Sequence, residues 1–315
     1  MSSTLTNNGV GWGRQGKVTS KQIQEKRKLK QLTKKYKLLN KIKIETKYMT
    51  IPYITPKQQE IPKLLYKFRF INRLQIQKLL HHKYHKRIID WLNDLVEKKY
   101  LEKVPKANSF EERTKLTVYR IGINGIRFLK TQKDCSEKII RKLYKDNDRS
   151  DNFISNCQLL ADICLDLKEQ NKDGDMSYEV IMSSDLINTE SPFHFLIDLN
   201  PSLVYKEIKK YGRGTKSSYF LLEAFETTLP GYSINKRIRA YLEFYYTNEW
   251  EDNMSKTFPT LKFICPTKAD LINTKRYTKK LLEENDNPED INIEFATIDE
   301  IKKSGIVEAI WEEVE

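Results

Sequence analysis

Three side chains in the second half of the sequence have the types that a metal-dependent phosphodiesterase uses. Asp198, Glu223 and Lys236 lie at or after apolar segments, and two acids with a lysine can hold a divalent ion and its attacking water. Such sites place a lysine two residues after the second acid, but Phe225 stands at that position. We therefore expect no catalytic residues and no cofactor, and a binding protein in place of an enzyme. The alternative is a Mg²⁺- or Mn²⁺-dependent DNA nuclease built on Asp198, Glu223 and Lys236.

Other catalytic signatures are missing from the sequence. It contains no P-loop, GxGxxG, HExxH or GxSxG motif, which argues against NTP hydrolysis, dinucleotide binding and serine-hydrolase chemistry. His81, His82 and His85 form the one histidine cluster. Phosphate contact or solvent exposure explains these histidines better than metal binding, so no metal ligands are predicted.

The stretch from Lys83 to Val104 offers chemistry of another kind, because it has one apolar face and one basic face. At helical spacing the apolar face comprises Ile88, Ile89, Leu92, Leu95 and Val96. The side chains off this face suit contacts with bases and phosphates in a DNA groove; they are Lys83, His85, Lys86, Arg87, Asp90 and Asn93. An ordinary surface helix is the alternative.

The neighbouring segments predict how this helix is positioned. Thr55-Pro56 starts a helix that runs to about Phe68, and Asn72 caps a second short helix. Two strands, Tyr100–Val104 and Thr117–Ile121, then flank a charged loop. Helix, helix, helix and hairpin predict a winged helix-turn-helix over residues 51–145. Its wing carries three candidate DNA contacts, Lys106, Arg113 and Lys115.

A strongly basic arm precedes this domain. Residues 1–50 form a partly flexible segment in which Lys17 to Lys47 carry 12 basic and 2 acidic residues. We expect the arm to follow a polyanion, and its composition does not distinguish DNA from RNA. The candidate contacts within it are Lys26, Arg27, Lys28, Lys30, Lys34, Lys35 and Lys37.

The charge changes sign along the chain. Residues 1–145 carry 36 Lys and Arg against 11 Asp and Glu, whereas the remaining residues carry 20 against 32. Net charges of +25 and −12 restrict polyanion binding to the first half. The acidic domain, residues 146–315, is expected to contact a protein partner or a second copy of itself.

The acidic domain shows a mixed pattern of helices and strands. A helix is expected over Phe153–Lys168. For the whole chain we expect an α+β fold, in which a winged helix is followed by a mixed α/β domain. The expected strands are Phe193–Leu199, Ser218–Phe225, Leu261–Cys265 and Ile291–Phe295, and the helices between them are Tyr232–Tyr246 and Lys268–Glu284.

The sequence contains no apolar run long enough for a membrane span and no signal peptide. Its four cysteines lack CxxC spacing, which favours reduced, structural thiols over a disulfide framework or a zinc knuckle. We expect a cytoplasmic protein that does not bind a membrane.

In this order, the elements resemble the replication-relaxation family of plasmids and other mobile elements. The Thr-Pro helix TPKQQEIPKLLYKF, the LVEKKYLEKV end of the third helix and the strand segment VYRIGINGIRFL carry the resemblance. It implies double-stranded DNA binding in replication, transfer or their control. A winged-helix transcription repressor is the alternative within the same fold.

The resemblance extends to the second domain, through SYFLLEAFETTLPGYSINKRIRAYLEFYY and FPTLKFICPTKADLINTKRY. It implies a restriction-endonuclease-like core. The sequence departs from the family at the acids: a Pro-Asp pair is replaced by Pro201-Ser202, and a Glu-x-Asp pair by Glu223-Ala224-Phe225. The resemblance therefore implies a core that has lost its catalytic function.

Overall fold

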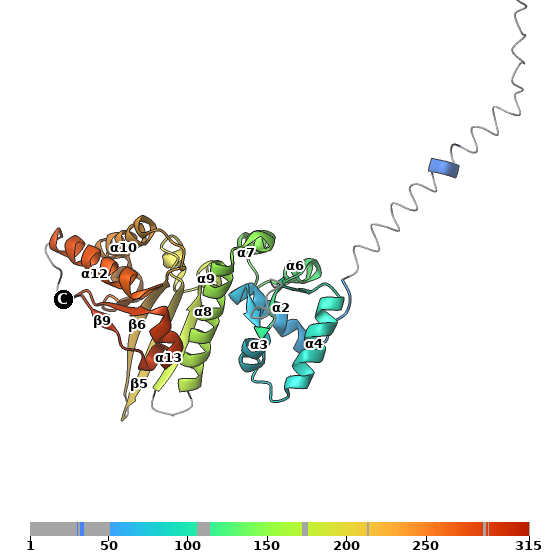
Figure 1. The fold of residues 1–315 in the computed structure, drawn as a ribbon, viewed down its shortest axis with the longest axis horizontal. Coiled ribbons are helices and arrows are strands. Elements are labelled where there is room, and N and C mark those ends of the chain that lie inside the picture. The colour runs from blue at the N-terminus through green and yellow to red at the C-terminus, as the bar shows by residue number, and fades with distance from the viewer. Residues whose placement is uncertain are drawn as a thin grey trace, which may run out of the picture. The chain divides into compact units, whose positions relative to one another are not determined.

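The computed structural model describes residues 30, 32–34, 51–105, 114–171, 176–212, 214–285, 288 and 290–314. Within these residues, helices are combined with a three-stranded and a six-stranded sheet (Figure 1). This is consistent with the expected α+β class. Pro52–Glu315 form one compact unit. None of the described helices is long and apolar enough to cross a membrane.

Helix α2 (Pro56–Phe68) begins and ends as predicted. The Thr55 hydroxyl accepts from the Gln58 N–H at 3.4 Å, and the Gln58 side chain accepts from the Thr55 N–H at 2.9 Å. This reciprocal cap satisfies two donors that the first helical turn leaves free. Pro62 lies inside the helix without ending it, and the inward side chains Ile61 and Leu65 are fully buried.

Two further helices follow, α3 (Arg73–Leu79) and α4 (His85–Glu97). Asn72 caps α3 as predicted, since its side-chain oxygen accepts from the N–H groups of Leu74 and Gln75 at 2.9 and 3.1 Å. Helix α4 begins two residues later than expected, so Lys83 lies in the turn that precedes it.

A small antiparallel sheet follows α4, with the order β1-β3-β2. Its strands are β1 (Ile71–Asn72), β2 (Leu101–Lys103) and β3 (Val118–Ile121). The predicted pairing of the two strands after α4 is confirmed, with Leu101 opposite Ile121. Helix α6 (Ile123–Leu129) then passes close to the sheet, because a Cβ at Gly125 would lie 2.4 Å from the Tyr100 carbonyl oxygen.

The polar segment around the predicted domain boundary forms helices that the sequence did not predict. It contains helix α7 (Glu137–Leu143) and the 3₁₀ helix η1 (Asp146–Asp148) before α8 (Asp151–Gln170). Three buried apolar side chains, Ile139, Ile140 and Leu143, fix α7 against α2 and α6. The predicted α8 is confirmed and extends beyond both expected ends.

The second sheet has the order β4-β5-β6-β7-β8-β9. Its strands are β4 (Met176–Met182), β5 (Leu203–Tyr211), β6 (Gly214–Ala224), β7 (Thr260–Cys265), β8 (Ile293–Thr297) and β9 (Glu312–Glu313). The pairs β4–β5, β5–β6 and β8–β9 are antiparallel, and β6–β7 and β7–β8 are parallel. Strands β6, β7 and β8 confirm three of the four predicted strands.

The fourth predicted strand, Phe193–Leu199, is wrong. The chain there forms a 3₁₀ helix, η2 (His194–Ile197), which follows the short helix α9 (Ser183–Leu186). Leu196 and Leu199 are buried from this helical turn, so their apolar character reflects core packing and not strand pairing. Strands β4 and β5, which the sequence did not predict, occupy the first two places in the sheet.

Helices cover both faces of the six-stranded sheet (Figure 1). The predicted helices α10 (Gly231–Tyr246) and α12 (Lys268–Glu283) pack on one face, and α11 (Glu249–Met254) contacts α10. Helices α8 and α13 (Ile298–Glu308) cover the other. Strand β7 is buried along Leu261–Cys265, Lys262 included, as the mainly apolar composition of the segment predicts.

Two polar contacts connect α2 and α3 to the segment that begins at residue 146. The Gln75 side chain donates to Asp162 of α8 at 2.7 Å. Arg69, which follows α2, forms an ion pair with Asp146, and Asp146 is only 2% exposed. The four cysteines are free, and all but Cys135 are buried.

Candidate functional site

Helix α4 separates buried apolar side chains from exposed polar ones. Ile88, Leu92 and Leu95 recur at intervals of four and three residues and are 0% exposed, so they hold the helix against its neighbours α3 and β2. The predicted inward position of Ile89 is wrong: its side chain is 36% exposed. A rotation of about 100° per residue carries it away from the face that Ile88 buries.

The outer face of α4 collects the residues that the sequence singled out for DNA contact. All of them are exposed: Lys83, His85, Lys86, Arg87, Asp90 and Asn93. Lys83 reaches this surface from the preceding turn, and the other five belong to the helix. Tyr84 provides no side-chain cap, so no capping side chain accepts from the first backbone N–H groups of α4. These N–H groups add to the positive potential at this end of the helix.

An aromatic cluster that the sequence did not reveal fixes the turn between α3 and α4. The His82 ring packs edge-on against Trp91, with ring centroids 5.0 Å apart. The Tyr84 N–H donates to His82 Nδ1 at 3.2 Å. The Arg87 guanidinium lies 5.8 Å from the centre of the Trp91 ring. The cluster therefore orients one candidate DNA contact, Arg87, on the outer face.

The predicted wing is only partly within the described residues. Strands β2 and β3 flank it, and the Arg120 side chain donates to Glu102 at 2.9 and 3.1 Å across them. Lys115 is exposed at the end of the loop. Lys106 and Arg113 lie outside the described residues.

Most of the basic arm also lies outside the described residues. Lys30 and Lys34 are helical and exposed, as contact with a polyanion requires. The predicted contacts Lys26, Arg27, Lys28, Lys35 and Lys37 fall on residues that the structure does not describe.

Among the described residues, no hydrogen bond or ion pair joins the three proposed nuclease residues to one another. Glu223 lies in β6, Asp198 is exposed after η2, and Lys236 is exposed on α10. The cation that reaches Glu223 is Arg237, the next residue along the helix, with its guanidinium nitrogen 2.7 Å from the carboxylate. Adjacent helical residues point in different directions, so Lys236 faces solvent where Arg237 faces the sheet.

The Glu223 carboxylate is engaged by donors of α10. Tyr241 donates its hydroxyl to Glu223 at 2.7 Å. Arg237 also donates to the carbonyl oxygens of Leu199 and, at 2.8 Å, of Asn200. Glu223 and Arg237 thus tie β6, α10 and the turn before β5 together as a structural ion pair.

The surroundings of Arg237 and Tyr241 keep the arginine charged and the tyrosine neutral. Burial acts to lower the pKa of Arg237, but Glu223 and Tyr241 outweigh it and the pKa is raised. Complete burial, followed by the charge of Glu223, raises the pKa of Tyr241 well above its ordinary value. Tyr241 therefore stays a neutral donor and Arg237 a cation, and a metal ion at Glu223 would have to displace both.

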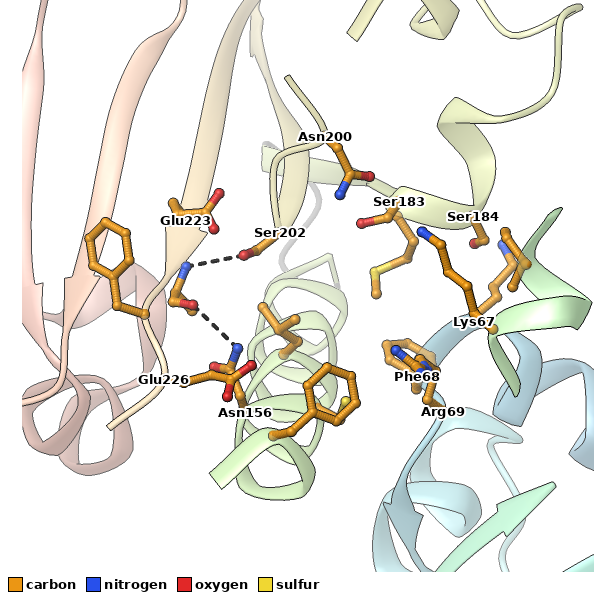
Figure 2. A pocket seen from close by; sticks show the side chains of 18 of the residues that line it. Lys67, Phe68, Arg69, Asn156, Ser183, Ser184, Asn200, Ser202, Glu223 and Glu226 are labelled. Atoms are coloured by element: carbon orange, nitrogen blue, oxygen red, sulfur yellow. Dashed lines mark hydrogen bonds between the residues drawn. The ribbon is translucent and has the colours of Figure 1, made fainter. Parts of the chain in front are cut away.

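Ser202 and Phe225, at the two positions where the resemblance implies acids, make structural contacts. Ser202 accepts a hydrogen bond from the Ala224 N–H at 3.2 Å and joins β5 to β6 (Figure 2). Phe225 is buried and stacks on Phe263, with ring centroids 5.9 Å apart. Among the described residues, no group of three or more His, Cys, Asp or Glu side chains is placed to hold a metal ion.

Comparisons with known proteins give no family for this chain: no protein-family model, no curated protein and no solved structure matches it.

Proposed function

We propose that this chain binds double-stranded DNA through the outer face of α4. The observation that carries the proposal is the division of α4 into a fully buried apolar face and an exposed basic face. An amphipathic helix held in this way offers its exposed side chains to the major groove while its inner face secures the orientation. The net charge of +25 on residues 1–145 supplies the attraction to phosphates.

The arrangement around α4 supports a winged helix as the DNA-binding module. Helices α2, α3 and α4 precede the antiparallel strands β2 and β3, which is the order of elements in that module. Helix α4 would be the recognition helix, and the loop between β2 and β3 the wing, with Lys115 at its end. The resemblance to the replication-relaxation family supports a role in the replication or transfer of a mobile element, or in their control.

The features of the second domain favour a binding function over a cleaving one. Helix α8, strands β4 to β6, helix α10 and strand β7 follow one another in the order of a restriction-endonuclease-like core. The Glu223 carboxylate of this core is held by Arg237 and Tyr241. We infer that the domain contacts a protein partner or a second copy of this chain.

A footprint on the DNA of the source element tests this function. The purified full chain is expected to protect a defined duplex segment equally with and without Mg²⁺, and to leave the strands intact. A two-fold symmetric footprint upstream of its own coding region would favour the repressor role over a replication role. Strand cleavage that requires Mg²⁺ and is lost in Glu223→Gln would overturn the choice of binding over cleavage.

A further inference from the structure

The hairpin formed by β5 and β6 is basic although its domain is acidic. Residues 146–315 carry a net charge of −12, yet between residues 206 and 218 the two strands carry four lysines and a single acid, Glu207. The lysines are Lys206, Lys209, Lys210 and Lys216. The net charge of the domain conceals this local concentration, which has the sign that attracts nucleic-acid phosphates.

The outer part of the hairpin extends beyond its neighbours in the sheet (Figure 1). Strand β6 pairs with β7 only from Phe220 onward, and β4 pairs with β5 only as far as Lys209. Residues 210–212 and 214–216 are exposed at the end of this two-stranded ribbon. A ribbon of two strands is narrow enough to enter the major groove of a duplex.

Two of the four lysines have no counter-ion within the described residues. Lys206 and Lys209 each pair with a glutamate, at 3.3 and 2.9 Å, whereas Lys210 and Lys216 form no ion pair there. Lys216 also lies directly opposite Lys209, and like charges at opposed positions destabilise a strand pair. The fold therefore gains nothing from the charge of Lys216, which a bound polyanion would neutralise.

The tip of the hairpin adds neutral hydrogen-bond donors to these charges. Tyr211 is 60% exposed, and the exposed Thr215 lies opposite Lys210. Tyrosine and threonine hydroxyls donate to the phosphate oxygens of DNA, as lysine does. None of the exposed, described residues of the tip is an acid, so nothing there repels a phosphate.

Further basic side chains connect the hairpin with the start of α4. A hollow of about 390 Å³ between the α3–α4 turn and the end of α8 is lined by Lys78, Lys83 and Lys168, and Glu169 pairs with Lys78 there. Asn171, the residue after α8, accepts a hydrogen bond from the Tyr178 N–H of β4, and β4 pairs with β5. The turn before α4, the end of α8 and the hairpin tip lie along one edge of the unit, the lower edge in Figure 1.

We propose that the β5–β6 hairpin is a second DNA-binding element, which contacts the phosphates of the duplex on one flank of the segment bound by α4. This second contact rests on the proposed function of α4, because the basic edge begins at Lys83, beside that helix. Contacts to phosphates carry no sequence information. The hairpin therefore strengthens binding and fixes the register of α4 on the duplex without reading bases.

Fluorescence anisotropy with a labelled duplex tests the second contact in the full chain. Lys210→Ala with Lys216→Ala should weaken duplex binding by about fivefold or more and make the salt slope shallower by about 2, since each lost phosphate contact removes about 0.9. Lys256→Ala with Lys279→Ala removes two exposed lysines that lie after α11 and on α12 and should change neither. An unchanged affinity and slope in the hairpin variant would overturn the proposal.

Lys86→Ala with Arg87→Ala, measured beside these variants, separates the two DNA contacts. If the α4 variant loses affinity and the hairpin variant does not, the hairpin proposal fails alone. If the hairpin variant loses affinity and the α4 variant does not, the proposed function of α4 fails. A wild-type chain that binds no duplex would overturn both.

Hydroxyl-radical footprinting locates the second contact. The hairpin variant should lose protection on one flank of the footprint and keep it in the centre, and an even loss along the footprint would contradict the assignment. Lysines also prevent pairing at open strand edges. A hairpin variant that self-associates in light scattering, with DNA affinity and footprint unchanged, would assign the lysines to that protective role and overturn the proposal.

Discussion

Asp146 is the buried acid that connects the residue after α2 to the segment that leads into α8. It is 2% exposed and pairs with Arg69, while the Arg149 guanidinium lies 3.8 Å away. Both arginines also pack over the Phe153 ring. The single carboxylate therefore holds two cations beside an aromatic ring and maintains the strained backbone of Arg69, where φ is 66°.

Removal of this carboxylate is expected to be costly. Asp146→Ala should lower the free energy of unfolding by about 3–5 kcal/mol, because two partly buried arginines lose their counter-ion. Asp148→Ala removes an exposed carboxylate from the same short helix and should stay within about 0.5 kcal/mol of the wild type. Urea unfolding followed by circular dichroism measures both, and similar values for the two variants would contradict the role given to Asp146.

Glu226 leads to a prediction about pH. Its pKa is raised in the fold by burial, so the folded state resists its ionisation and stability falls as the pH rises through that folded pKa. Glu226→Gln removes this loss. The Tm of the variant should therefore exceed that of the wild type by more at pH 7 than at pH 4. Thermal unfolding at the two pH values checks this, and a pH-independent difference would count against it.

Residue types and their spacing predicted part of the candidate functional site, and the other part could not be predicted from them. The exposed face of α4 was predicted because its spacing follows helical periodicity. Arg237 was missed in favour of Lys236, since both are cations at adjacent positions and only the packing of Ile234 and Ile238 decides which one faces the sheet. The contacts of Trp91 with His82 and Arg87 depend on the turn between two helices, which no local pattern encodes.

At the scale of elements, local signals with a physical mechanism predicted the structure well. The caps at Thr55 and Asn72 start their helices where expected. The apolar run Phe193–Leu199 was misassigned because its composition suits a buried strand and a buried helical turn equally. Helix α7 was missed because only three of its seven side chains are buried in a segment of polar composition.

The contact between α6 and the small sheet leads to a prediction for Gly125. Gly125→Ala would place a Cβ 2.4 Å from the Tyr100 carbonyl oxygen and 2.5 Å from the Ile121 side chain. We expect a loss of about 1–3 kcal/mol in the free energy of unfolding. Gly231→Ala is the matched control, since no atom lies within 4 Å of a Cβ there. Chemical denaturation should show Gly231→Ala as neutral or slightly stabilising, and an equal loss in both variants would contradict the close approach.

At the scale of the whole molecule, charge is the feature that sequence predicts most directly. The division into +25 and −12 follows from counting residues, whereas the order β4-β5-β6-β7-β8-β9 depends on pairings distant in sequence. The basic surface of the β5–β6 hairpin could not be predicted either, because Lys209 and Lys216 meet only through the pairing of the two strands.

The charge division predicts a strong salt dependence of DNA binding. If six to ten phosphates are contacted, the logarithm of the association constant should fall against the logarithm of salt concentration with a slope of about −5 to −9. Fluorescence anisotropy of a labelled duplex across a salt series measures the slope. A slope near zero would mean that the basic first half does not contact the phosphates.

The central claim is that the outer face of α4 binds duplex DNA, and a paired substitution tests it most directly. Lys86→Ala with Arg87→Ala removes two exposed cations from α4, and Arg276→Ala with Lys279→Ala removes the same two residue types from the exposed surface of α12. Anisotropy at fixed salt should show duplex affinity reduced by about tenfold or more for the α4 pair, since each lost cationic contact weakens binding. The α12 pair should bind like the wild type, and all three proteins should unfold at the same temperature. An α4 variant that folds normally and binds with wild-type affinity would contradict the claim.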